Sequence, residues 1–140
     1  MQRRKARELC LQILFQHEFS KELNIDKSVD YFKQHHHIDN TSSEYASLLL
    51  KGVIVLKSKI DSLINDSSKN WKTSRMSSVD LNILRMSIYE AVLLDPPNEP
   101  KVVINESLEI AKKYSSADSA TFINGVLDQV FHLQLGNFNT

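Results

Sequence analysis

Glycine and proline are scarce in this sequence, with three of each among 140 residues. So little turn chemistry disfavours a sandwich or barrel of many short strands and favours helices. The glycines, at positions 52, 125 and 136, are too far apart for a glycine-rich phosphate loop. With 41% hydrophobic residues, the chain can bury one core but is too short for two ordinary domains. Residues 1–140 are therefore predicted to form a single domain.

Cysteines and long apolar runs are also lacking. The single cysteine, Cys10, excludes an internal disulfide and suits a reducing compartment. No apolar run approaches the roughly 18 residues that span a bilayer, and the arginine-rich start lacks the apolar stretch of a signal peptide. These absences predict a cytoplasmic protein that does not interact with membranes.

An excess of one charge is missing too, because 17 Lys and Arg balance 17 Asp and Glu. No global field therefore draws the protein to nucleic acid. Four basic residues nevertheless fall within five consecutive positions: Arg3, Arg4, Lys5 and Arg7. At about 100° per residue, a helical stripe combines this charge with an aromatic ring: Arg4, Arg7, Leu11 and Phe15. Cations neutralise phosphates and exposed rings stack on unpaired bases, so this stripe is a candidate RNA-binding face.

Apolar residues spaced by three and four predict about six or seven helices. The segments are 3–20, 26–37, 41–67, 77–95, 101–114 and 116–135. Predicted capping residues are Asp26, Thr41 with Glu44, and Ser77 with Asp80.

Two sequence features fall between or inside these helices. The polar connector over 68–77 carries Trp71 and Met76, which can plug the core. Gly125 lies inside the last helix at a cost of about 1 kcal/mol against alanine, so close packing of another helix or close approach of a ligand is expected there.

Catalytic and metal-binding chemistry is sparse. His35, His36 and His37 are consecutive, whereas two ligands on one helical face need a spacing of three or four. Cys10 lies on the inward stripe of its helix, and nothing nearby in sequence would activate it. We therefore expect no metal, no cofactor and no catalytic residue.

Two segments of the chain resemble the NusB family of transcription antitermination factors. The first runs from Arg3 through Glu8 to Phe15. The second and more specific comprises Val103–Tyr114, Asp118-Ser119 and Phe122–Asp128. Between them, Leu84–Glu90 resembles the family's central helix, so the likeness reaches from Arg3 to about Phe131. It implies an all-α fold of two packed helical subdomains and a non-enzymatic role.

The resemblance also implies partners and binding residues. Family members bind the boxA element of ribosomal RNA leader transcripts with the ribosomal protein NusE, in the RNA polymerase antitermination complex. Carried over, the RNA-binding residues are Arg3, Arg4, Lys5, Arg7, Phe15, Asp118 and Phe122. The acidic partner-facing position of the central helix maps to Asp80. Ala120 and Thr121 stand where relatives often carry histidine and lysine, and Ser115 replaces a helix-ending glycine, which puts basic support for RNA there in doubt.

Several alternatives remain open. Phe122 could stack on a base or join Phe131 in the core, and Asp80 could simply cap its helix. The chain could be a detached targeting module related to ribosomal RNA cytosine methyltransferases, some of which begin with a NusB-like part. It could also be a helical protein-interaction homodimer without RNA binding.

Overall fold

The computed structural model describes residues 2–20, 22, 24–67 and 70–138. Within these ranges it contains seven α-helices and no strand, which confirms the all-α prediction. The helices are α1 Arg3–Phe19, α2 Ile25–His35, α3 Asn40–Val55, α4 Lys57–Ser67, α5 Ser78–Ile88, α6 Pro100–Tyr114 and α7 Ala117–Leu135. A 3₁₀ turn, Thr73–Arg75, precedes α5, and a π-helical turn, Tyr89–Leu93, follows it.

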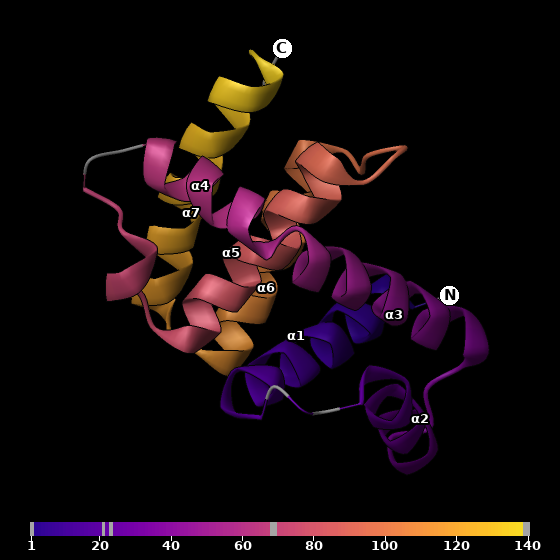
Figure 1. The fold of residues 1–140 in the computed structure, drawn as a ribbon. Coiled ribbons are helices and arrows are strands. Elements are labelled where there is room, and N and C mark those ends of the chain that lie inside the picture. The colour runs from indigo at the N-terminus through magenta and orange to yellow at the C-terminus, as the bar shows by residue number, and fades with distance from the viewer. Residues whose placement is uncertain (1, 21, 23, 68–69, 139–140) are drawn as a thin grey trace.

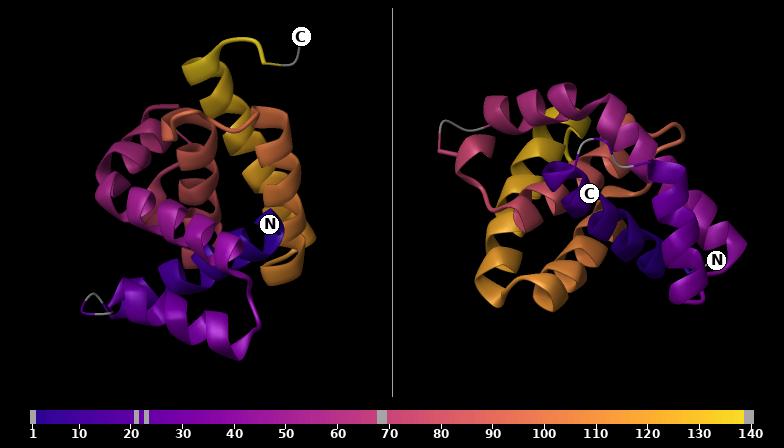
Figure 2. Two further views of the ribbon diagram at one scale, coloured as in Figure 1. Left: turned by 90° about the vertical axis from the view of Figure 1, so that its right-hand side faces the viewer. Right: turned by 60° about the horizontal axis from the view of Figure 1, so that its bottom comes forward.

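The helices form two packed groups, with α1–α3 on one side and α4–α7 on the other (Figure 1). The central helix α5 packs against α1, α6 and α7, and so joins the groups. The start of α1 lies against α6 (Figure 2, left), although the two segments are about a hundred residues apart in sequence. No helix among the described residues is long and apolar enough to cross a membrane.

Helix starts follow the capping chemistry, but two caps differ from the prediction. Asn24 accepts a hydrogen bond from the backbone N–H of Lys27, so it rather than Asp26 caps α2. Asp39 likewise caps α3 in place of Thr41. In both cases an acceptor two residues earlier in the sequence reaches a free N–H of the first turn. The predicted cap of α5, Ser77, is confirmed, since its hydroxyl accepts from the N–H of Asp80.

The long helix predicted over 41–67 is divided at Leu56 into α3 and α4. The apolar pattern conceals this break, because Val53 before it and Ile60 after it are both buried. The glycine that is closely packed is Gly52, where an added Cβ would overlap the ring of Tyr89. At Gly125 an added Cβ would meet nothing within 4 Å, so the prediction of close helix packing there is wrong.

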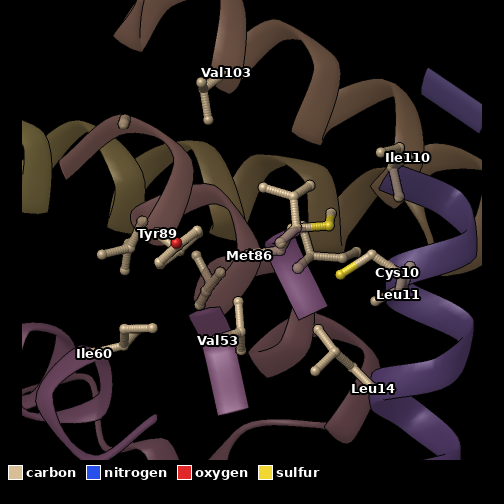
Figure 3. Close-up of a cluster of buried hydrophobic side chains, with 14 of the residues drawn as sticks. Cys10, Leu11, Leu14, Val53, Ile60, Met86, Tyr89, Val103 and Ile110 are labelled. Carbon is tan, nitrogen blue, oxygen red and sulfur yellow. The ribbon is translucent and has the colours of Figure 1, made fainter. Parts of the chain in front are cut away.

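Buried apolar side chains from all seven helices form one connected core. Cys10 and Leu14 of α1 point into this core with Met86 of α5 (Figure 3). Burial raises the pKa of the Cys10 thiol far above its usual range, which fits the predicted core role and not that of a nucleophile. Trp71 is partly buried against the core, as predicted for the connector, whose residues 68 and 69 lie outside the described ranges.

Candidate nucleic-acid interface

Arg4 stands at the start of α1 with its side chain 56% exposed. Its Nε and Nη2 donate to Oε2 of Glu106 on α6 at 2.9 and 2.6 Å. The hydrogen bonds that Arg4 donates to Glu106, together with the negative charge of this carboxylate, raise the pKa of Arg4. Arg4 therefore remains accessible to a phosphate, but that phosphate would have to compete with a carboxylate.

Arg7, one turn further along, is buried, with its side chain 4% exposed. Its Nε and Nη2 donate to the two carboxylate oxygens of Glu90 at 2.7 and 2.9 Å, in a bidentate pair. Burial disfavours the charged guanidinium, but Glu90 outweighs this effect and raises the pKa of Arg7. The prediction that Arg7 shares an exposed stripe with Arg4 and Phe15 is wrong, and Leu11 is buried as well. Because α2, α3 and α5 all pack on α1, its buried arc is wider than one apolar stripe.

Glu90, which lies in the π-helical turn, is the centre of a buried polar cluster. The hydroxyl of Tyr45 donates to Glu90 Oε2 at 2.7 Å, and the amide of Asn98 donates to the same oxygen at 2.6 Å. Burial and the nearby carboxylate raise the pKa of Tyr45 to about 12. Arg3 joins this cluster from the surface, since its Nη1 donates to Asn98 Oδ1 at 3.2 Å and its guanidinium lies 4.9 Å above the Tyr45 ring. Through Arg3 and Arg7, the cluster thus holds the arginine-rich start of α1 in place.

An open groove of about 620 Å³ lies between α1 and α6. Its charged lining consists of Arg3, Arg4, Lys5, Glu8, Glu106, Glu109 and Lys113. Cations and acids are therefore mixed along this groove. Lys113 Nζ donates to Glu8 Oε1 at 2.6 Å, and this contact raises the pKa of Lys113.

The groove continues along α1 toward aromatic residues. A second pocket, of about 230 Å³, shares Lys5, Glu8 and Lys113 with the groove. A third, of about 370 Å³, contains Phe15 and shares Gln12, Phe32 and Tyr114 with the second. The whole surface therefore passes from charged to aromatic side chains; we call the three pockets together the α1 channel.

Phe15 is an exposed aromatic residue at the end of the α1 channel, as the prediction requires. Its side chain is 39% exposed and its ring meets that of Phe19, which is 73% exposed, at a centroid distance of 5.0 Å. Whether Phe15 contacts RNA remains a prediction. The structure does bring Arg3, Arg4, Lys5 and Phe15 together along one surface.

The remaining predicted site residues lie around the start of α7. Asp118 is exposed, whereas Phe122 is half-buried and packs against the core. Base stacking by Phe122 stays a prediction. Asp80 Oδ2 accepts from the hydroxyl of Ser119 at 3.1 Å and ties α5 to α7. None of these three residues lines the α1 channel, although Val79, the neighbour of Asp80, lines its third pocket.

Sequence reasoning did not identify the residues that α2 and α6 contribute to the α1 channel. These are Phe32, Glu106, Glu109, Ile110, Lys113 and Tyr114, together with His36 directly after α2. The spacing of residues within one helix cannot predict them, because they face α1 only when α1, α2 and α6 are packed together. Among the described residues, no group of three His, Cys, Asp or Glu is placed to hold a metal ion.

Comparison with known proteins gives a consistent result. The NusB family profile matches residues 4–132. A transcription antitermination protein NusB from Bdellovibrio bacteriovorus is 45% identical over 128 residues, which cover 91% of this chain and 93% of that protein. The solved structure of T. maritima NusB is 32% identical, with a TM-score of 0.78 over 93% of this chain and 90% of its own.

A solved complex of NusB and NusE with double-stranded RNA contains a chain of the same fold. It has a TM-score of 0.82 and 24% identity, covering 94% of this chain and 96% of that chain. The family profile and the 45% identical relative both extend over most of the sequence. The chain therefore belongs to the NusB family of transcription antitermination proteins, which are not enzymes.

Proposed function

We propose that this protein binds boxA-type single-stranded RNA of ribosomal RNA leader transcripts along the α1 channel, with the ribosomal protein NusE as its partner in a cytoplasmic antitermination complex. The observation that carries the proposal is the juxtaposition of exposed Arg3, Arg4 and Lys5 with Phe15 along one continuous surface. A structural neighbour in which NusB forms a complex with NusE and double-stranded RNA supports the RNA and NusE parts of the proposal.

The two ends of the α1 channel suit different parts of a single strand. Arg3, Arg4 and Lys5 would neutralise phosphates, which supplies affinity without sequence preference. Phe15 would stack on an unpaired base. Arg7 would act indirectly, since its guanidinium is committed to Glu90 and holds α1 in place.

Asp118, Phe122 and Asp80 belong to the proposal with less direct support. Asp118 and the exposed part of Phe122 would meet the RNA where it leaves the α1 channel. Asp80 would sit at the partner face, where its bond to Ser119 holds α5 and the start of α7 together.

Among the alternatives, an antitermination factor is favoured over a module related to methyltransferases. The relative from B. bacteriovorus is matched over 93% of its own length and is itself named an antitermination protein. A homodimer without RNA binding would require the exposed cations of the α1 channel to have no role.

Salt titration of binding to a boxA-type single-stranded RNA tests the proposal. Each phosphate contact releases counterions, so log K falls as log salt rises. Arg4→Ala and Lys5→Ala should each make this negative slope shallower by about 1. Lys59→Ala, an exposed cation on α4, is the matched control and should leave the slope unchanged. Equal slopes for all variants, or no binding with or without NusE, would refute RNA binding by the α1 channel.

A further inference from the structure

A stacked pair of aromatic rings at the C-terminal end of α2 lines the α1 channel. Phe32 of α2 and His36, the residue directly after this helix, have ring centroids 5.4 Å apart and an interplanar angle of 17°. Both line the pocket of about 230 Å³ in the middle of the channel. The neighbouring His35 stacks instead on Tyr31 and is absent from that pocket's lining.

The other lining residues of this pocket come mainly from α6 and α1. The ring of Tyr114 lines the pocket, and its hydroxyl is held by Gln12 at 3.4 Å and Glu8 at 3.2 Å. Lys5 and Lys113, both exposed, also belong to the lining. The lining thus combines aromatic rings, an amide, a carboxylate and exposed cations. Together they supply the chemistry that a nucleotide requires, namely stacking, hydrogen bonding and phosphate neutralisation.

We propose that this pocket is a base-binding subsite, in which the stacked pair of Phe32 and His36 at the end of α2 packs against one unpaired base of a single-stranded RNA. The inference rests on the proposed function and extends it, since it adds α2 to an RNA surface otherwise formed by α1 and α6. The pocket lies below the roughly 300 Å³ typical of sites for drug-sized ligands, which suits one base.

The occupant follows from continuity with the rest of the α1 channel. The pocket shares Lys5 and Lys113 with the charged groove and Phe32 with the pocket of Phe15. A strand that runs from Arg4 to Phe15 therefore crosses it. The strand would place one nucleotide over Phe32 and His36, between the nucleotides whose phosphates contact the cations and the base that stacks on Phe15.

Two adjacent histidines provide a matched pair of variants. His36→Ala should weaken binding of a boxA-type single-stranded RNA about 5-fold or more, because it removes part of a stacking surface. His35→Ala, a change at an exposed histidine outside the pocket lining, should leave affinity unchanged. His36→Phe, which keeps a ring at this position, should restore binding. The salt slope should be the same in all three, unlike that of Lys5→Ala.

The same RNA with one base removed at each position in turn identifies the nucleotide. Wild type should lose affinity at one internal position, and at that position His36→Ala should show no further loss. If wild type binds no RNA, the proposed function itself fails. If wild type binds and Lys5→Ala flattens the slope, but His36→Ala equals His35→Ala, only the α2 subsite is refuted. Loss of NusE binding without loss of RNA binding in His36→Ala would assign this stacked pair to protein and overturn the subsite.

Discussion

Arg4 and Arg7 lie one turn apart on α1, but their replacement by alanine should change the stability of the protein by different amounts. Arg7→Ala would leave Glu90 buried and without its counter-charge, a change that typically costs about 3–5 kcal/mol of unfolding free energy. Arg4→Ala breaks an exposed pair and should change stability little. Urea denaturation of both variants measures the difference. Equal losses would show that the Glu90 cluster does not depend on Arg7.

Glu106 competes with RNA for Arg4, and its removal should therefore strengthen binding. Glu106→Gln frees the Arg4 guanidinium and removes a negative charge from the groove. An exposed pair of this kind corresponds to an affinity gain of about 2- to 5-fold. Asp66→Asn on α4 removes the same charge at an exposed position outside the α1 channel and serves as the control. Fluorescence anisotropy at low salt would measure both, and weaker RNA binding by Glu106→Gln would contradict the competition.

At the scale of single residues, the helical projection of α1 predicted burial correctly at some positions and wrongly at Leu11 and Arg7, both of which are buried. Cys10 lies in the core and Phe15 at the surface, as their places on the helical projection indicate. Arg7 could not be predicted, because its partner Glu90 is 83 residues away and the projection does not count the helices packed on α1. The burial of an arginine can be predicted only when the carboxylate that pairs with it is known.

At the scale of the helices, alanine at Gly52 and alanine at Gly125 should change the stability of the protein in opposite directions. Gly52→Ala places a methyl group against the buried ring of Tyr89, and such overpacking typically costs about 1–3 kcal/mol. Gly125→Ala meets nothing within 4 Å on an exposed face of α7, so helix propensity should raise stability by about 0.5–1 kcal/mol. Thermal denaturation of the two variants tests the signs. A destabilised Gly125→Ala would indicate that an unseen constraint acts on this turn.

Helix positions were largely predictable from apolar spacing, whereas the surfaces between helices were not. The starts of α2 and α3 differ from the prediction by only a few residues, because several polar side chains near each start could serve as caps. The α1 channel takes Lys5 from α1, Phe32 from α2 and Tyr114 from α6. Such a surface depends on how three helices cross, which periodicity within one helix does not specify.

For the molecule as a whole, ion pairs near both ends of α1 join the two groups of helices. Near the start of α1, Arg7 pairs with Glu90 of the π-helical turn. Near its end, Glu18 accepts from Arg85 Nη1 of α5 at 2.9 Å, and Arg85 Nε and Nη2 also donate to Asp61 of α4 at 2.9 Å. Burial disfavours the charged form of Glu18, but hydrogen bonds from Ser78 and Asn82 and the charge of Arg85 lower its pKa overall. Separating the two groups would therefore expose apolar surface and leave charges without their partners.

We accordingly propose that both groups unfold together as one domain, and the chain offers a single reporter in each. Cys10 is buried in α1, and the only tryptophan, Trp71, packs against the core from the connector before α5. In urea, thiol accessibility and tryptophan fluorescence should change with the same midpoint, because coincident transitions mark a two-state process. Circular dichroism of the helices gives the reference transition. A fluorescence change that precedes thiol exposure would mean that α4–α7 unfolds while α1 stays packed, and that the polar clusters of Glu90 and Arg85 do not couple the two groups.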